Sequence, residues 1–172
     1  MRKKKKLKKY LPEFVYGAID GSVTTFAVVA GAVGASLSSA IILILGFANL
    51  FADGFSMAVS NYLSNKSDRD LNGNKKFEKK PLKSAAATFI SFIVVGFAPL
   101  LFFVLALFLP ALLKQSFLFA SILTAVAFFF VGFVKGEITG KKKIYSAVET
   151  LLIGGVASAI AFLVGYLLRG IS

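Results

Sequence analysis

The chain of 172 residues contains no cysteine and no histidine. Disulfides, thiolate zinc sites, imidazole metal ligands and histidine-based nucleophile–base pairs are therefore all excluded. Acidic residues are also scarce, because eight Asp and Glu stand against 20 Lys and Arg, for a formal net charge of +12. Neither an enzyme active site nor a resident cofactor is expected in such a chain.

Apolar residues, in contrast, make up 57% of the sequence, and the mean hydropathy is +0.80. Ordinary soluble domains are closer to half apolar, so this composition indicates a membrane protein. Five stretches are long enough for helices that cross a bilayer, which needs about 20 apolar residues. They lie at about 14–36, 40–63, 84–109, 117–135 and 145–168. The sequence thus predicts an all-α integral membrane protein with five transmembrane helices in a single domain, 1–172, with Pro99 bending the third helix and Pro110 ending it.

Basic residues are grouped in three segments. Seven lie in the tail 1–12, seven in the loop 64–83 and four in 135–143, which leaves only Lys114 and Arg169 elsewhere. Because cytoplasmic segments collect Lys and Arg, we expect the N-terminus and the basic loop in the cytoplasm and the C-terminus outside. The tail then contacts anionic lipid headgroups of the bilayer. The charge could instead suggest nucleic acid, but no aromatic-interleaved platform accompanies it, so no nucleic-acid partner is expected.

Three carboxylates fall inside predicted membrane helices, namely Asp20, Asp53 and Glu149, and Glu13 lies at the start of the first helix, where the interface could solvate it. A charged group at the bilayer centre costs at least ~2.5–3.5 kcal/mol, so such residues usually face a bundle interior or a polar pathway. A buried Asp53 would need a basic partner, and Lys135 is the nearest candidate. However, Lys135 lies at a helix end and is expected to snorkel to the interface. Glu149 and Lys135 are therefore candidates for a proton pathway, with an interfacial position as the alternative.

Residue spacing places the polar groups on two helix faces. Asn49, Asp53 and Met57 follow one another at intervals of four and form one stripe, and Glu13 and Asp20 share a face of the first helix. If the two faces meet, they form a polar channel that opens toward the cytoplasm. Taken singly, Met57 could fill a packing gap and Asn49 could hydrogen-bond a neighbouring helix.

The side chains of this channel have a defined ligand chemistry. Carboxylate and amide oxygens suit Mg²⁺, Ca²⁺ and Mn²⁺, and a thioether shifts the preference toward Fe²⁺, Co²⁺ or Zn²⁺. Closely placed buried carboxylates cannot all stay ionised without a cation. Metal entry should therefore release protons, and returning protons should release metal.

Small residues recur at intervals of four in two helices. Gly17 and Gly21 bracket Asp20 in the first helix. The last helix carries the same pattern at Ala157, Ala161 and Gly165. Such faces let helix backbones approach closely, either within a subunit or between subunits. A crossing between two copies would bring two Asp20 carboxylates together, which suggests a homodimer.

Five longer segments carry a family resemblance. They are YGAIDGSVTTFAVVAGA, ILGFANLFADGFSMAVSNYLSNKSD, ATFISFIVVGFAPLL, GFVKGEITGKKK and SAVETLLIGGVASAIAFLVGYLL. In this order they resemble the vacuolar iron transporter family. The resemblance implies a five-helix homodimer that moves Fe²⁺, and often Mn²⁺ or other divalent ions, out of the cytosol in exchange for protons, along the dimer interface. It also implies that Asp20 and Met57 form the membrane-embedded metal-binding pair and that Glu13 lies at the cytoplasmic mouth.

Two features depart from that family. Some members carry the acidic residue of the second helix where this chain has Asn49, whereas this chain carries Asp53. Well-studied members also insert a cytoplasmic helical domain, rich in Glu and Met, between the second and third helices. Here that connection is short and basic, and Glu78 is its only glutamate.

From the resemblance we expect an exporter of divalent Fe²⁺, Mn²⁺ or both. The Lys-rich tail and the absence of a targeting peptide favour a prokaryotic plasma (inner) membrane. One alternative is an exporter of the same fold that serves Mn²⁺ homeostasis. Another is a non-transporting membrane scaffold that lost its activity together with the metal-binding domain.

Overall fold

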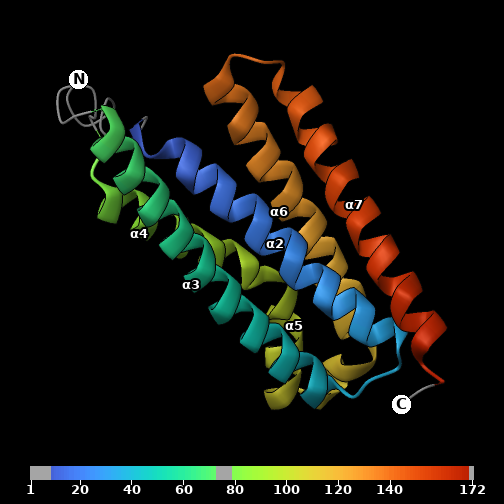
Figure 1. The fold of residues 1–172 in the computed structure, drawn as a ribbon. Helices are drawn as coiled ribbons and strands as arrows, with labels where there is room; N and C mark the ends of the chain where they lie inside the picture. The colour runs from blue at the N-terminus through green and yellow to red at the C-terminus, as the bar shows by residue number, and fades with distance from the viewer. Residues whose placement is uncertain (1–8, 73–78, 171–172) are drawn as a thin grey trace.

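The computed structural model describes residues 9–72 and 79–170, and every element within them is a helix (Figure 1). The elements are α2 (Leu11–Gly34), α3 (Ser39–Asn72), α4 (Pro81–Gly96), α5 (Ala98–Phe108), the 3₁₀ helix η1 (Pro110–Gln115), α6 (Ser116–Thr139) and α7 (Lys143–Leu168). Most of the basic tail and Glu78 lie outside the described residues. Four helices are long and apolar enough to cross a membrane, namely α2, α3, α6 with η1, and α7, and α4 and α5 reach that length only together. The chain is therefore a helical multi-pass membrane protein, as predicted.

The third predicted membrane helix is bent by 49° between α4 and α5. Pro99 lies at this bend. A proline bends a helix because its ring lacks an N–H and collides with the carbonyl four residues earlier. The backbone N–H of Leu100 instead donates to the carbonyl of Phe97 at 3.0 Å, in a tighter turn. α5 then ends at Phe108, two residues before Pro110. Both proline predictions are confirmed.

α3 is the helix that differs most from its predicted bounds. Its apolar part was expected to end near residue 63, but the helix continues to Asn72. Hydropathy marks where a helix leaves the bilayer and not where it ends, and no Gly or Pro interrupts 64–72. The predicted loop 64–83 is therefore too long, and the connection between α3 and α4 is confined to 73–80.

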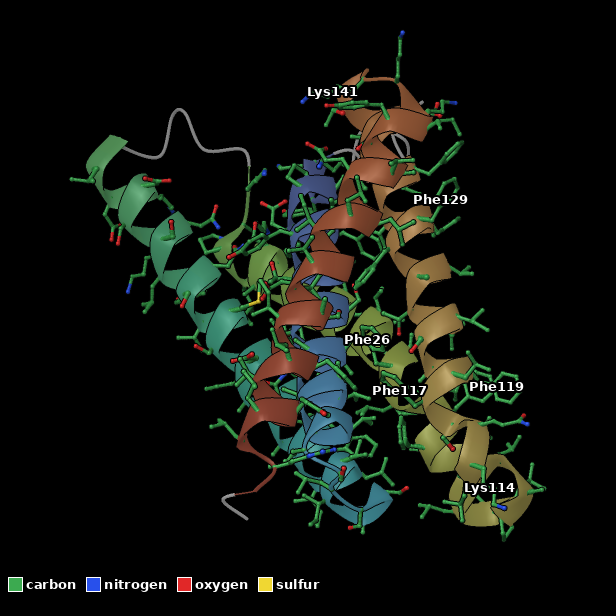
Figure 2. All side chains as sticks on the ribbon, turned by 90° about the vertical axis from the view of Figure 1, so that its right-hand side faces the viewer. Phe26, Lys114, Phe117, Phe119, Phe129 and Lys141 are labelled. Carbon is green, nitrogen blue, oxygen red and sulfur yellow. The ribbon has the colours of Figure 1, made fainter. Side chains whose placement is uncertain are left out.

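α2 lies at the centre of the bundle and packs against α3, α4, α6 and α7 (Figure 1). Apolar side chains from α2, α3, α4 and α5 form one core cluster, which includes Phe26, Leu50, Phe92 and Leu100. Large apolar side chains remain exposed along α3 and α7, and Phe129 points outward from α6 (Figure 2). Such outer faces suit contact with lipid tails, which are as apolar as these side chains.

The bundle gathers most of its described basic residues at one end. The start of α2, the end of α3, the start of α4 and the α6–α7 turn all lie at one end, which we call the basic end (Figure 1). Lys141 lies at this end and Lys114 at the other (Figure 2). Among the basic residues that the structure describes, only Lys114 and Arg169 lie away from the basic end. This is the asymmetry on which the expected orientation depends.

The closest approach of α2 to α4 is made at Gly17 and Gly21. A Cβ atom added to Gly21 would lie 2.5 Å from the carbonyl oxygen of Phe92, and one added to Gly17 would overlap the carbonyl oxygen of Thr88. The small face that brackets Asp20 is thus covered by α4 of the same chain. Of the two alternatives, the structure adopts the crossing within a subunit, so this face does not support a homodimer.

α7 crosses α2 in the same manner at the other end of the bundle. A Cβ atom added to Gly165 would overlap the carbonyl oxygen of Gly31, and one added to Gly31 would lie 3.3 Å from the carbonyl oxygen of Ala161. The small residues of the last helix therefore also pack within the subunit. These two crossings hold α2 between α4 and α7.

We expect Gly21→Ala to lower the free energy of unfolding by about 1–3 kcal/mol, because the added methyl group must push α2 away from Phe92. Gly155→Ala in α7 is the matched control, since nothing lies within 4 Å of a Cβ atom there, and it should be neutral or stabilising. Thermal unfolding of both variants in detergent, followed by circular dichroism, measures the difference. Equal midpoints for the two variants would contradict the close α2–α4 crossing.

Candidate functional site

Asp20 of α2 and Asp53 of α3 lie at the same level of the bundle. The two helices are antiparallel, and Asp20 lies 14 residues before Gly34, the end of α2, while Asp53 lies 14 residues after Ser39, the start of α3. At about 1.5 Å per residue, both lie about 21 Å from the connecting turn, inside a hydrocarbon core about 30 Å thick. Both side chains are half-buried. The carboxylate-bearing residues of α2 and α3 therefore share one depth on two helices that pack against each other.

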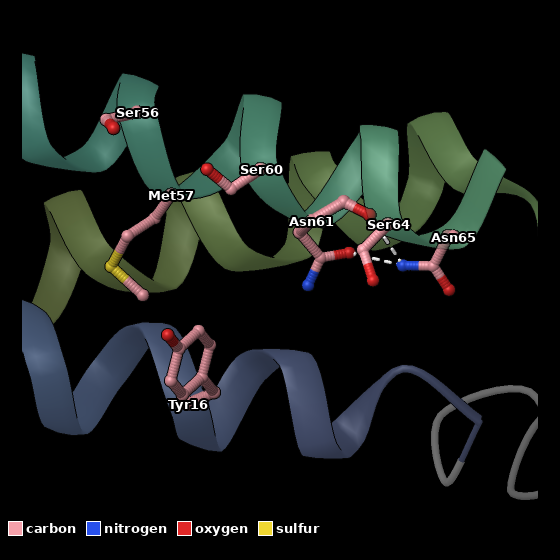
Figure 3. Close-up of a pocket in the computed structure, with 7 residues that line it drawn as sticks. All are labelled: Tyr16, Ser56, Met57, Ser60, Asn61, Ser64 and Asn65. Carbon is pink, nitrogen blue, oxygen red and sulfur yellow. Dashed lines mark hydrogen bonds between the residues drawn. The ribbon is translucent and has the colours of Figure 1, made fainter. Parts of the chain in front are cut away.

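Met57 lies one turn beyond Asp53 and lines a polar pocket of about 350 Å³ between α2 and α3 (Figure 3). Tyr16 lines the pocket from α2, and its ring lies opposite Met57. The other lining residues all come from α3 and are Ser56, Ser60, Asn61, Ser64 and Asn65. Met57 also packs against the core cluster, so the packing interpretation holds alongside its place in the pocket. Because α3 runs from Asp53 to the basic end, the pocket extends from the level of the carboxylates toward that end.

Two amides of this pocket are held by hydrogen bonds. Asn65 Nδ2 donates to Asn61 Oδ1 at 2.6 Å and to Asn61 O at 2.8 Å, and Asn61 Nδ2 donates to Thr88 Oγ1 of α4 at 3.1 Å. Sequence reasoning missed both residues, although they continue the four-residue series that runs from Asn49 to Met57. Asn61 lies within the predicted helix 40–63, so this spacing is a signal that could have found it, whereas Asn65 falls in the predicted loop 64–83.

Asn49 lies two turns before Met57 and is half-buried. Its Nδ2 atom is buried and has no hydrogen-bond partner within residues 9–72 and 79–170. The alternative in which this atom bonds a neighbouring helix is therefore not realised in that part of the chain. An orphaned buried amide is costly, and the amide can rotate to place its carbonyl oxygen at the same point. Asn49 can thus offer a neutral oxygen ligand on the stripe.

One chain does not form a closed metal cage. The part of the chain that the structure describes contains no group of three Asp, Glu, His or Cys side chains placed to hold a metal ion. The carboxylates of Asp20 and Asp53, with the thioether of Met57 nearby, are all half-exposed. Divalent metal ions in proteins take four to eight ligands, so these groups are an incomplete ligand set.

Glu13 is buried, with only 7% of its surface exposed, so the expected solvation at the interface is wrong. Its Oε1 atom accepts hydrogen bonds from Lys79 Nζ at 2.7 Å and from Ser84 Oγ at 3.3 Å. Its Oε2 atom is also buried and has no partner among the described residues. Burial results because α4 begins against the start of α2, where the backbone N–H of Lys80 donates to the hydroxyl of Tyr10. Sequence reasoning missed Lys79 because nothing in a run of lysines singles one out.

Glu149 and Lys135 pair with each other. Lys135 Nζ of α6 lies 3.0 Å from Glu149 Oε2 of α7, and their side chains are 28% and 36% exposed. Asp20 and Asp53, in contrast, lie at the same level and carry charges of the same sign. The basic partner that sequence reasoning considered for Asp53 is therefore engaged by Glu149, and neither member of this pair lies alone in the membrane.

A sequence model of the VIT family matches residues 11–78 and 72–166, which together make up most of the chain. The chain belongs to the VIT family. The vacuolar iron transporter of Toxoplasma gondii is 28% identical to it, over 93% of this chain and 74% of that protein. That of Centaurea cyanus is 29% identical, over 87% and 84%, and vacuolar iron transporter 1 of Arabidopsis thaliana is 28% identical, over 87% and 82%.

This VIT family member is shorter than its Toxoplasma gondii relative within the region that the two share. Their alignment has 225 positions, more than the 172 residues of the chain, so that relative carries residues that are missing here. The two segments of the chain that the VIT family matches overlap at 72–78, at the end of α3 and in the connection to α4.

We expect the Lys135–Glu149 pair to contribute modestly to stability, because both side chains are partly exposed. Lys135→Glu or Glu149→Lys alone should lower the midpoint of thermal unfolding by about 2–4 °C, through like-charge repulsion. The double exchange restores opposite charges and should recover most of that loss. A double variant that is as unstable as the two single changes combined would contradict the pairing.

Proposed function

We propose that this VIT family member exports divalent Fe²⁺, Mn²⁺ or both from the cytosol in exchange for protons. The observation that carries the proposal is the shared depth of Asp20 and Asp53 inside the apolar bundle, one turn from Met57. The names of its relatives, which are vacuolar iron transporters, support the same class of substrate.

The exchange with protons follows from the charge of the pair. Two carboxylates that face each other in a medium of low dielectric repel strongly unless a cation neutralises them. A divalent metal ion can neutralise both at once, and so can protons that replace it. Asp20 and Asp53 therefore bind either the metal ion or protons, and each species displaces the other. The pocket of hydroxyl and amide groups provides the path from the basic end to this pair.

The choice of metal depends on the neutral ligands. The Met57 thioether favours Fe²⁺ over the harder Mn²⁺, whereas the amide oxygen of Asn49 suits both ions. Export of Mn²⁺ by the same residues is the first alternative. Glu149 and Lys135 remain candidates for a proton pathway, and they form an ion pair near the basic end.

The orientation that we propose places the basic end in the cytoplasm, in agreement with the positive-inside rule. Metal ions then enter from the cytoplasm through the end that carries Glu13, and the turn between α2 and α3 faces outward. We place the chain in a prokaryotic plasma membrane, with its tail on anionic lipid. Transport into a vacuole moves ions away from the cytosol in the same sense, so the vacuolar relatives fit the same direction.

The working unit that we propose is a homodimer. Within residues 9–72 and 79–170, the candidate ligands of one chain are too few to enclose a metal ion, and their half-exposed surface on α2 and α3 is where a second copy can add its own set. Two copies would contribute four carboxylates and two thioethers to one pathway. This arrangement does not need the Gly17–Gly21 face, which α4 already covers.

The dimer can be tested by single-cysteine variants, because the chain has no cysteine. Ser56→Cys lies on the exposed side of the pocket next to Met57 and should form a disulfide between copies under oxidation. Ile153→Cys on the exposed face of α7 is the matched control and should remain monomeric on a denaturing gel. Absence of a crosslink in both variants, together with failure of two differently tagged copies to co-purify, would rule the dimer out.

Metal transport can be tested in liposomes that contain a metal indicator and a pH dye. Wild-type protein should move Fe²⁺ or Mn²⁺, under reducing conditions, against an opposite proton flux. Asp20→Ala should abolish both fluxes, and Met57→Ala should weaken Fe²⁺ transport by about tenfold and Mn²⁺ transport less, because only the softer ion gains from the thioether. Asp70→Ala removes an exposed carboxylate from the end of α3 and serves as the control with unchanged flux.

The scaffold alternative makes the opposite prediction. A folded, dimeric wild-type protein that moves no divalent ion would overturn the transport proposal and favour a scaffold. Flux that survives Asp20→Ala would overturn the assignment of the site while leaving transport intact.

A further inference from the structure

In the ion pair of Glu13 and Lys79, an ammonium group contacts a buried carboxylate. Glu13 is 7% exposed, yet only its Oε1 atom is satisfied, by Lys79 Nζ at 2.7 Å and Ser84 Oγ at 3.3 Å. Its Oε2 atom is buried without a partner among the described residues. A buried carboxylate oxygen that lacks a donor is costly, so a cation that reaches Oε2 is bound favourably.

Lys79 is placed so that it can leave this carboxylate. Its side chain is 31% exposed, so a path to solvent exists, whereas the Glu13 side chain is only 8% exposed. Lys79 belongs to the connection between α3 and α4, two residues before Pro81, where α4 begins. It is therefore a cation attached by a short piece of chain, with an effective concentration on the order of mM or higher at Glu13.

We propose that Lys79 is a tethered cation that a divalent metal ion displaces from Glu13, and that this exchange sets how readily metal ions enter the pathway. The inference deepens the proposed function and rests on it for the identity of the ion.

The charges favour this exchange only for a divalent ion. The singly charged ammonium group of Lys79 donates to one oxygen, Oε1, and Oε2 has no partner among the described residues. A divalent ion can occupy Oε2 first and then bind both oxygens, as bidentate carboxylates do with metal ions. A monovalent ion brings no more charge than Lys79 already supplies and competes against a tethered partner. Lys79 therefore discriminates against monovalent ions and raises the concentration of metal needed for entry.

The consequence is an entry site about 10 Å along α2 from Asp20, given seven residues at about 1.5 Å each. An ion released from Glu13 moves toward the pocket lined by Tyr16 and Met57. Lys79 can then return to the vacated oxygen, which disfavours return of the ion.

The first experiment replaces the tethered charge chemically in Lys79→Cys, the only cysteine of that variant. One sample is treated with aminoethyl methanethiosulfonate, which restores an ammonium group, and another with methyl methanethiosulfonate, which adds a neutral group. Lys80→Cys, one residue further along and exposed, receives the same treatments and controls for the change in surface charge. Each protein is then reconstituted, and Mn²⁺ uptake is measured.

The KM for Mn²⁺ should fall by about threefold to tenfold in Lys79→Cys at unchanged kcat, since a competitor at an effective mM concentration has been removed. The restored ammonium group should return KM to the wild-type value, and the neutral group should not. Lys80→Cys should keep the wild-type KM throughout. An identical KM with the ammonium and neutral groups, or an equal shift in Lys80→Cys, would overturn the proposal.

The second experiment uses the wild-type protein and needs no variant to fold. Acetylation of lysines in detergent is quantified by mass spectrometry while Mn²⁺ is titrated. Displacement should make Lys79 more reactive as Mn²⁺ saturates, with Lys80 unchanged, and constant reactivity of Lys79 would overturn the proposal. Because this readout reports binding at Glu13 and not transport, it also separates the two proposals. An absence of flux with displaced Lys79 contradicts only the transport function, and flux without displacement contradicts only the role of Lys79.

Discussion

Contact between helix backbones at glycine is the constraint on which the rest of this bundle depends. Helices in a membrane gain little from hiding apolar surface, because lipid tails are as apolar as their side chains. Gly21 against Phe92 and Gly165 against Gly31 let α4 and α7 approach α2 closely enough for dispersion and packing to hold them. With α2 held between these two helices, its remaining polar side is directed toward α3. Asp20 of α2 and Asp53 of α3 lie there at the same level.

The α2–α3 hairpin converts a spacing in the sequence into a shared depth. The two helices are antiparallel and start from one turn. A residue of α2 therefore lies at the same depth as the residue of α3 that is equally many positions from that turn. Asp20 and Asp53 match in this way, and so do Tyr16 and Met57, which line one pocket. The polar series on α3 continues beyond them through Asn61 and Asn65, each held by a hydrogen bond. The result is a row of polar groups within an apolar bundle, with amides and hydroxyls toward the basic end and carboxylates deeper along the two helices.

The short connection between α3 and α4 brings the ends of these two helices together in this VIT family member. It is confined to residues 73–80. A short connection keeps Lys79 within reach of Glu13, and the direct start of α4 buries that carboxylate. The charge of Glu13 is thereby balanced within the chain itself, by the ammonium group of Lys79.

The sequence by itself determined the membrane class, the approximate helices, the bend at Pro99 and the concentration of basic residues that the fold gathers at one end. Each follows from local composition or from the covalent limits of one residue, so no knowledge of partners is needed. Asp20, Asp53 and Asn49 could be singled out in the same way, because polar groups are costly in apolar stretches. Only the tertiary structure decided which groups pair. Gly17 and Gly21 pack against α4. Lys135 pairs with Glu149, and Lys79, out of many lysines, pairs with Glu13. Those pairings join residues far apart in the chain, and their choice depends on helix rotation and register, which hydropathy does not encode.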